Sequence, residues 1–407
     1  MKRIINRAWL VFNLLVILVM GLVVSGKEPG PIGFGKTFGG QILEAVHSIE
    51  QTAGGGYIAV AAISSDADPV KSRRHFWVLK LDEKGELLGA QIFQPINYYR
   101  YGELLTLEGQ YIIAGKLAYT MGFRDKNEFF IMRVDSKNQK LWEEEYSELS
   151  GDHEFVLKPT RDGGFIAAGE TSYIGQGLAD LCLLCLDRNG RKLWEKDFGT
   201  SFEDRANSVD QTRDGGFIVG GNTSHPNGWV IKVDKKGARQ WDKIIDQEVV
   251  SVLAAVDGGY LLLSAARSTI NPRRPQELVL AKLGDGGRVD WEKRLPQFHI
   301  GESYPVMIRT RDSGYLIAGE TDLAGDGNLD LFVLKLDRGG GREWDRTFGG
   351  PRPDGAQAVS QTRDGGFIIA GYTESFVNKE RDLYERVLWV LKLDEQGNCA
   401  VQNCRQK

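Results

Sequence analysis

The chain has 407 residues, of which 42% are hydrophobic and 26% charged, and it contains 50 glycines and 12 prolines. This balance allows a buried core and excludes a disordered polar chain. The formal net charge is −4 and no long basic run occurs, so the composition also excludes the electrostatic footprint of a nucleic-acid-binding protein.

Residues 1–26 differ in composition from the rest of the chain. Three basic residues precede an apolar run from Ala8 to Val24, which is the order found in a secretory signal peptide. The run is also at the short limit for a membrane span, so an N-terminal membrane anchor through residues 8–24 is the alternative. Both interpretations predict an extracytoplasmic protein that is secreted, periplasmic or at the cell surface. It contacts a membrane only if this segment stays uncleaved.

A repeated unit of about 50 residues follows this segment. Its clearest phrase is Asp-Gly-Gly-Phe, which occurs at Asp162–Phe165, Asp214–Phe217 and Asp364–Phe367. Weaker copies extend the series to seven aromatic anchors, namely Tyr57, Tyr111, Phe165, Phe217, Tyr260, Tyr315 and Phe367. Seven anchors indicate seven units.

Each unit contains four short predicted strands, A to D. Strand A ends at the Asp-Gly-Gly turn, and strand B follows as a run such as Ile218–Gly221. After a variable loop, strand C is apolar and ends at an Asp, as in Trp229–Asp234, and strand D carries a Trp such as Trp241. Short runs rich in Val, Ile, Leu and Trp favour β-structure. Four strands in a unit of this size are typical of a propeller blade.

The two ends of the repeat region complement each other. The last unit stops after strand C, at Asp394–Gly397, and has no closing strand D with its Trp. The segment Gly35–Gly40 precedes the first unit and matches Arg346–Gly350 at the end of strand D in unit six. We therefore predict an all-β, seven-bladed β-propeller of four-stranded blades over residues 27–398. An N-terminal strand closes its ring and removes the exposed sheet edge.

These phrases resemble a family of exported bacterial β-propeller repeat proteins that is largely uncharacterised. The pattern runs Phe-Gly-Gly, Gln-Thr-x-Asp-Gly-Gly-Tyr/Phe, Gly-x-Thr, and Lys-Leu-Asp-x-x-Gly with a following Trp. One copy here is matched by Gln211, Thr212, Gly221, Thr223, Lys232, Val233, Asp234, Gly237 and Trp241, with Val in place of Leu. The resemblance covers residues 33–398 and implies the propeller fold, which hosts many different activities. The second and fifth units depart most from the pattern.

The four cysteines fall into two pairs. Cys399 and Cys404 lie in the C-terminal tail, residues 399–407, and export favours a disulfide between them. Cys182 and Cys185 lie in one predicted strand, where an odd separation places them on opposite faces. We expect these two to be buried thiols that do not bond to each other.

A ring of carboxylates is predicted where strand D passes to the next strand A, at one rim of the central channel. Thirteen residues before the anchor, five of the seven units carry an acidic residue: Glu44, Asp152, Asp204, Glu302 and Asp354. We favour a structural role, in which each carboxylate accepts backbone N–H groups in its turn. A cation-binding ring is the alternative.

Calcium is the one cofactor alternative in this sequence. Asp326, Asn328 and Asp330 have the spacing of a calcium loop. No Glu completes an EF-hand, and Asp330 has a repeat counterpart in Asp180, which favours a turn-capping role. The histidines show no zinc spacing, and no GxSxG or convincing catalytic triad occurs. We therefore predict no metal, no cofactor and no catalytic residue.

The B–C loops are the long and variable segments, and they are expected on the same face as the carboxylates. They are Ser64–His75, Ala118–Glu128, Arg267–Glu277 and Thr373–Arg386. Variable loops on a rigid scaffold usually carry binding. We predict that their basic residues contact a partner, namely Arg73, Arg74, Arg124, Arg273, Arg274, Lys379 and Arg381. Ordinary solvated loop charge is the alternative.

Together these features predict a non-enzymatic scaffold that binds an unidentified protein or glycan through one loop-rich face. Two alternatives stay open. The first is a propeller enzyme of the quinoprotein type, because the phrase Leu186–Trp194 resembles the repeats of that group. Against it, the chain lacks adjacent cysteines that would form a vicinal disulfide against a quinone ring. The second is a purely structural envelope protein.

Overall fold

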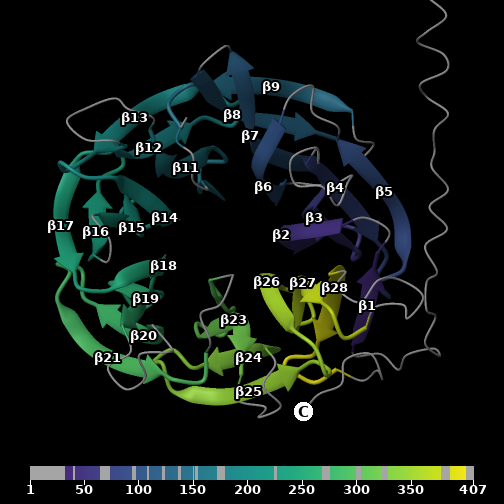
Figure 1. Ribbon diagram of the computed structural model, residues 1–407. Helices are drawn as coiled ribbons and strands as arrows, with labels where there is room; N and C mark the ends of the chain where they lie inside the picture. The colour runs from purple at the N-terminus through teal and green to yellow at the C-terminus, as the bar shows by residue number, and fades with distance from the viewer. Residues whose placement is uncertain are drawn as a thin grey trace, which may run out of the picture.

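The protein is a ring of seven four-stranded antiparallel sheets, as the computed structural model shows (Figure 1). This confirms the predicted seven-bladed propeller. No helix of the described residues is long and apolar enough to cross a membrane. The structure describes residues 33–399 except 40–41, 65–73, 94–97, 108–109, 122–123, 136–138, 150, 152–154, 172–178, 224–226, 268–275, 299–303, 323–328 and 377–385.

In each blade the first strand, A, lies next to the central channel and strand D lies at the outer rim (Figure 1). Blade 1 consists of β2 (Ile42–Gln51), β3 (Tyr57–Ser64), β4 (Arg74–Leu81) and β5 (Leu87–Phe93). Blade 2 consists of β6 (Tyr98–Leu107), β7 (Gln110–Met121), β8 (Arg124–Val134) and β9 (Lys140–Tyr146). Blade 3 consists of β10 (Val156–Pro159), β11 (Phe165–Glu170), β12 (Leu181–Leu186) and β13 (Lys192–Phe198). Blade 4 consists of β14 (Asp204–Gln211), β15 (Phe217–Thr223), β16 (Asn227–Val233) and β17 (Arg239–Ile245).

The last three blades follow the same order, except that the outer strand of blade 7 comes from the N-terminal region. Blade 5 consists of β18 (Glu248–Ala254), β19 (Tyr260–Arg267), β20 (Gln276–Leu283) and β21 (Val289–Leu295). Blade 6 consists of β22 (Val306–Arg309), β23 (Tyr315–Thr321), β24 (Asp330–Leu336) and β25 (Arg342–Phe348). Blade 7 consists of β26 (Asp354–Gln361), β27 (Phe367–Thr373), β28 (Val387–Leu393) and β1 (Phe34–Phe38).

The core lies between the blades. Seven apolar clusters of buried side chains each join two neighbouring blades. In one of them, Ile218 and Val230 of blade 4 pack with Val249 and Leu262 of blade 5. The middle strands are therefore covered on both faces, and β15 is buried along its whole length. This is why strands B and C are short continuous apolar runs in the sequence.

The N-terminal strand closes the ring. β1 pairs antiparallel with β28, from Phe34 opposite Lys392 to Phe38 opposite Leu388. The first and last parts of the repeat region therefore share one sheet, as Figure 1 shows for the purple β1 beside the yellow-green β28. The predicted closure is confirmed, and strand C of blade 7 has no exposed edge.

Strand D contacts the next blade through one aromatic residue. In five blades a Trp packs against the glycine of the C–D turn in the following blade, in the pairs Trp142–Gly190, Trp194–Gly237, Trp241–Gly287, Trp291–Gly340 and Trp344–Gly397. Phe34 does the same to Gly85 of blade 1, and it stands opposite Lys392 as Trp344 stands opposite Lys335. Gly85 has a φ of 76°, so a side chain there would be strained and would also overlap the Phe34 ring.

A second set of contacts latches the A–B turns together around the channel. Arg363 of blade 7 donates from its backbone N–H to Gln51 Oε1 and from its guanidinium to the Ala53 carbonyl, each at 2.8 Å. Arg161 donates in a similar way to Gln211 Oε1 and the Thr212 carbonyl of blade 4, and Arg311 donates to Gln361 Oε1 and the Thr362 carbonyl of blade 7. The blade 7 latch joins residues at opposite ends of the repeat region, so it also holds the ring closed.

Candidate functional site

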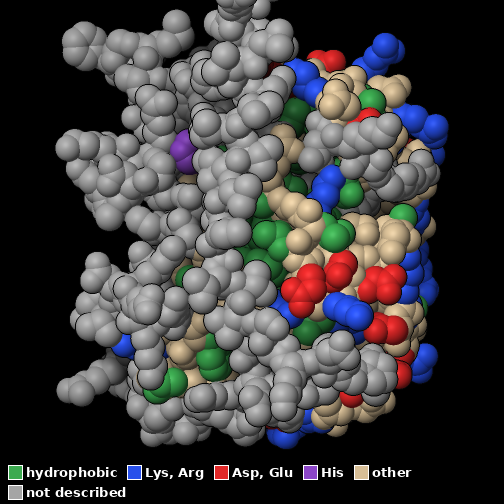
Figure 2. Space-filling model, turned by 90° about the vertical axis from the view of Figure 1, so that its right-hand side faces the viewer, with side chains coloured by type: hydrophobic (Ala, Val, Ile, Leu, Met, Phe, Trp, Pro, Cys, Tyr) green, Lys and Arg blue, Asp and Glu red, His purple; other side chains and the backbone are tan. Residues whose placement is uncertain are grey.

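The ring has two unlike faces. The A–B and C–D turns lie on one face, here called the turn face, because strand direction alternates along each blade. The B–C and D–A connections lie on the other, here called the loop face. Figure 2 views the ring from its rim, and described Lys and Arg side chains gather along its right-hand edge. The turn face carries exposed basic residues at Arg161, Arg213, Lys235, Lys236 and Arg363.

The basic residues predicted to bind a partner belong to the loop face. Arg74 is the first residue of β4 and Arg124 is the first residue of β8. The other five lie outside the described residues: Arg73, Arg273, Arg274, Lys379 and Arg381. The structure therefore does not bring these side chains together into a described site.

One of the expected loops is wrong. The segment Ala118–Glu128 was expected to be an open B–C loop, but β7 continues to Met121 and pairs there with Arg124 of β8. Tyr119 and Thr120 are good strand formers, so the chain extends the hairpin instead of leaving the sheet. Arg124 therefore lies within a β-hairpin.

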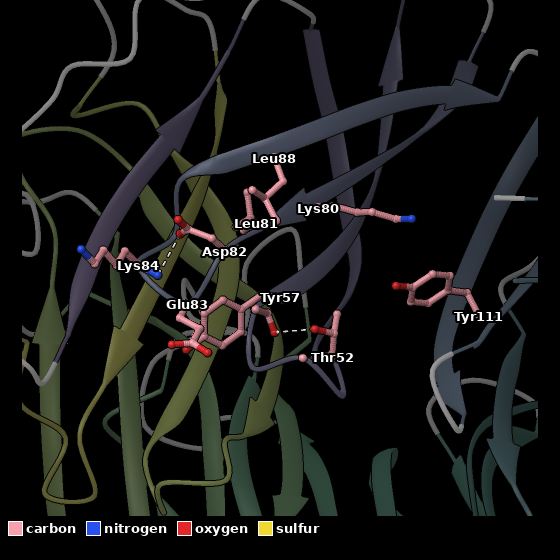
Figure 3. Close-up of a pocket in the computed structure, with 11 residues that line it drawn as sticks. Thr52, Tyr57, Lys80, Leu81, Asp82, Glu83, Lys84, Leu88 and Tyr111 are labelled. Atoms are coloured by element: carbon pink, nitrogen blue, oxygen red, sulfur yellow. Dashed lines mark hydrogen bonds between the residues drawn. The ribbon is translucent and has the colours of Figure 1, made fainter. Parts of the chain in front are cut away.

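A cleft of about 470 Å³ opens on the turn face between blades 1 and 2 (Figure 3). Its walls come from the A–B turn, the end of strand C and the C–D turn of blade 1, and from the first residues of strand B in blade 2. Figure 3 shows the Lys80 side chain pointing across the cleft toward Tyr111, with Tyr57 on the opposite side. The volume lies in the range of small-molecule sites.

The lining of this cleft is unusual because blade 1 departs from the repeat at three positions. Gly54 stands where blade 4 has Asp214, and Gly89 stands opposite Lys80 where blade 4 has Trp241 opposite Lys232. Leu88 replaces the Gln that precedes this Trp. Blade 1 therefore lacks the indole and the two polar side chains that line the equivalent cleft beside Lys232 in blade 4.

The equivalent cleft between blades 4 and 5 has a volume of about 540 Å³ and is lined by different side chains. Lys232 is only 3% exposed and donates to Asp214 Oδ2 and to Gln240 Oε1, each at 2.9 Å. Although burial alone raises it, hydrogen bonds from Thr212 and Lys232 hold the pKa of Asp214 at about 2. In blade 4 the lysine is therefore bound to its own blade.

In the blade 1 cleft the charges are mixed. Lys80 Nζ lies 5.0 Å from the centroid of the Tyr111 ring, within reach of a cation–π interaction. Burial lowers the pKa of Lys80, and Asp135 partly opposes this. Burial raises the pKa of Tyr57 and Tyr111, so both phenols stay protonated. The described lining residues offer two ammonium groups, two phenols and two carboxylates, and no nucleophile beside a base.

Two of the five predicted rim carboxylates are described in full. Asp204 and Asp354 are the first residues of β14 and β26, and both side chains are fully buried. Asp204 Oδ2 accepts from the Thr200 N–H at 2.5 Å, and Asp354 Oδ2 accepts from the Gly350 N–H at 2.8 Å. Both carboxylates therefore make the backbone contacts of turn caps.

The other three positions differ. Asp152 and Glu302 lie outside the described residues. Glu44 lies in a bulge of β2 between Leu43 and Ala45. The residue of blade 1 that pairs with strand B as Asp204 does in blade 4 is Leu43. The extra bulge moves Glu44 by one position, so counting residues from the anchor did not place it correctly.

The candidate calcium loop is described only at its last residue. Asp330 is fully buried at the start of β24, while Asp326 and Asn328 lie outside the described residues. Within the part of the chain that the structure describes, no three His, Cys, Asp or Glu side chains converge as a metal-binding group.

The cysteines lie in two different environments. Cys182 and Cys185 are free and buried in β12. Burial raises the pKa of the Cys182 thiol well above its usual value, and burial followed by the charge of Asp162 raises the pKa of Cys185 to about 12. Cys399 is disulfide-bonded, and its predicted partner Cys404 lies outside the described residues.

Comparisons with known proteins bear on the fold alone. No protein-family model matches the chain, and no curated protein matches it. It is similar to a BBS1N structure in complex with ARL6DN, at 10% identity and a TM-score of 0.51, covering 88% of this chain and 94% of that one. It is also similar to a puromycin hydrolase mutant complexed with PGG, at 13% identity and a TM-score of 0.50, covering 89% of this chain and 54% of that one. The phage phi92 endosialidase is similar at 11% identity and a TM-score of 0.49, covering 89% of this chain and 69% of that one.

Proposed function

We propose that this chain is a non-enzymatic binding scaffold that works outside the cytoplasm and presents its loop face to a protein or glycan. The observation that carries the proposal is the contrast between the two faces. Structural contacts hold the turn face in one repeated form, while the connections on the loop face differ from blade to blade.

The turn face supports this proposal by its uniformity. Thr212 and Thr362 begin A–B turns that close with the same backbone hydrogen bond, at 2.9 Å in both. The C–D turns repeat as well, with Asp234 and Asp337 each accepting N–H groups inside the turn. Side chains that are committed to latching neighbouring blades leave little surface free to vary.

The loop face supports it by its diversity. In blade 4 strand B ends at Thr223 and strand C begins at Asn227, whereas in blade 7 the same connection runs from Thr373 to Val387. A rigid ring that holds connections of different lengths is the usual arrangement of a binding surface. The basic residues of these connections are the proposed contacts.

An extracytoplasmic location is part of the proposal. It rests on the signal-like composition of residues 1–26 and on the disulfide at Cys399. Disulfides persist in oxidising compartments and are rare in the cytosol. Expression of the full chain, fractionation of the cells and N-terminal sequencing of the product would test both the location and the cleavage of the segment.

Charge reversal on the loop face tests the binding proposal. The labelled protein is applied to a printed glycan array and to immobilised surface extract of the source cells. We expect glutamate substitutions at Arg73, Arg74, Arg273 and Arg274 to weaken binding without lowering the melting temperature. The matched control reverses Lys235 and Lys236, two exposed residues of a turn-face turn. Binding that responds only to the turn-face change would refute the proposal.

The enzymatic alternative has a separate readout. A quinoprotein-like enzyme retains a coloured redox cofactor, so its absorbance spectrum and the mass spectrum of its small-molecule extract would reveal the cofactor. The protein can also be reconstituted with a quinone and assayed with an alcohol or aldehyde substrate. Oxidation of the substrate would replace the scaffold proposal with an enzymatic one.

A further inference from the structure

Two carboxylates from neighbouring blades meet on the loop face between blades 3 and 4. Asp180 precedes β12 and Asp204 begins β14. The backbone N–H of Asp204 donates to the carbonyl of Ala179 at 2.8 Å, which holds the two segments together. Asp204 is fully buried and Asp180 is 8% exposed. The repeat pattern does not reveal that these two residues are neighbours, because they belong to different units.

The Asp180 carboxylate lies against the backbone that leads to Asp204. A Cβ atom placed on Gly199 would overlap Asp180 Oδ1, so the backbone that leads from β13 to Asp204 passes directly over this oxygen. Asp180 Oδ1 is buried and accepts no hydrogen bond. A buried polar atom without a partner costs free energy, which indicates that something further belongs at this position.

The local charge is negative. Asp204 and Asp197 are the charged groups that act on the Asp180 carboxylate, and both are acidic. Among the described residues, neither Asp180 nor Asp204 forms a salt bridge with a Lys or Arg. Adjacent buried carboxylates are stable only when a proton or a cation compensates for their repulsion.

Hydroxyl oxygens lie beside Asp204. Thr200 Oγ1 lies 2.9 Å from Asp204 Oδ2 and 3.1 Å from Thr223 Oγ1. A second pair has the same construction between blades 6 and 7, where the Asp354 N–H donates to the Leu329 carbonyl at 2.8 Å. There a Cβ on Gly349 would overlap Asp330 Oδ1 and would lie 2.9 Å from Asp354 Oδ2.

We propose that Asp180 and Asp204 bind a hard divalent cation, with Ca²⁺ as the best fit, and that Asp330 and Asp354 form a second, equivalent site. Ca²⁺ takes six to eight oxygen ligands in flexible geometry, whereas Mg²⁺ demands a near-ideal octahedron. Two carboxylates, a threonine hydroxyl and water supply such a set of oxygens. The small number of charged ligands favours weak binding, on the order of 10⁻⁴–10⁻³ M.

The Phe-Gly phrase of strand D has a physical explanation in this proposal. Gly199 and Gly349 follow Phe198 and Phe348, and each glycine allows the backbone to pass beside a carboxylate that a side chain would displace. Each proposed cation site is a pair of carboxylates between two blades. It differs from the ring of five channel-rim carboxylates that was predicted from the sequence.

Titration of the full chain with Ca²⁺ and with luminescent Tb³⁺, after removal of metal by a chelator, tests this site. We expect two saturable sites at neutral pH and a rise in melting temperature of ~1–3 °C with saturating Ca²⁺. The Asp180→Asn and Asp330→Asn variants should each lose one site. In chelator, Asp180→Asn should not melt below the wild type, because it removes a buried like charge. Glu144→Gln, which removes one exposed charge from β9, should keep both sites.

The absence of saturable Ca²⁺ or Tb³⁺ binding to the wild type would overturn the proposal, even if a variant failed to fold. Unchanged stoichiometry in Asp180→Asn, or an equal loss in Glu144→Gln, would also overturn it. The remaining outcome is a proton shared within each pair. It would appear as a melting temperature that rises under mildly acidic conditions and does not respond to Ca²⁺, and it too contradicts the cation site.

Discussion

Replacing Phe34 with alanine is expected to weaken the contact that closes the ring. Phe34 is 3% exposed and lies in β1, a strand of five residues. Its ring packs edge-on to Tyr57 of blade 1, with centroids 5.7 Å apart, and it covers Gly85. The substitution removes an aromatic group from β1, which continues along the chain into β2 of blade 1 and joins blade 7 only by pairing with β28.

The expected magnitude follows from the burial of this side chain. Truncation of a buried Phe to Ala typically costs about 3–5 kcal/mol, as lost transfer free energy plus the cavity left behind. The edge-to-face contact with Tyr57 accounts for about 0.5–1.5 kcal/mol of such a loss. We therefore expect the free energy of unfolding to fall by roughly 3–5 kcal/mol.

Urea unfolding monitored by tryptophan fluorescence measures this loss. The matched control is Leu193→Ala in β13, because Leu193 occupies a strand D like Phe34 but is 56% exposed. A surface truncation of this kind is expected to change stability by less than about 0.5 kcal/mol. Deletion of Gly33–Gly40 should destabilise the fold strongly, and deletion of residues 1–26 should not. Equal unfolding midpoints for Phe34→Ala and Leu193→Ala, or for the two deletions, would refute the closure argument.

Three further predictions concern the turn face and the cysteines. The folded-state pKa of Asp214, about 2, lies below its usual value of 3.8, so its contribution to stability is complete above pH 3.8 and is lost as the pH falls towards 2. Acid unfolding of Asp214→Asn should therefore depend less on pH in this window than that of the wild type, and identical pH profiles would contradict the prediction. Cys182 and Cys185 should resist thiol reagents at neutral pH until the protein unfolds, because burial raises their pKa values; rapid labelling of the native protein would show otherwise. Mass spectrometry of non-reduced peptides should find Cys399 linked to Cys404, and free thiols at both positions would exclude that bridge.

The fold could be derived from local features of the sequence. The anchors from Tyr57 to Phe367, the turn glycines and the apolar strands repeat at a regular spacing. Turn chemistry and strand burial depend on a few neighbouring residues, so the sequence of each unit is enough to predict its strands and turns. The match of Gly35–Gly40 to the end of strand D also predicted which strand closes the ring. It did not reveal that Phe34 takes the place of the repeated Trp, because a different residue type hid the equivalence.

The candidate sites depended on the tertiary structure. The cleft of Figure 3 lies between Lys80 of blade 1 and Tyr111 of blade 2, and no pattern within one unit of the sequence indicates a space between two blades. The bulge that displaces Glu44 could not be found by counting, because one extra residue leaves the apolar pattern intact.

The sequence by itself determined the number of blades, their strand order and the closing strand, since these depend on patterns within one unit. Only the tertiary structure decided which polar groups face one another across blade boundaries. Asp180 and Asp204 come from different units, and the Asp204 N–H bonds the carbonyl beside Asp180. Their approach results from the angle and spacing at which two complete sheets pack. No single repeat encodes that geometry, because it arises only when the ring closes and every blade acquires two neighbours.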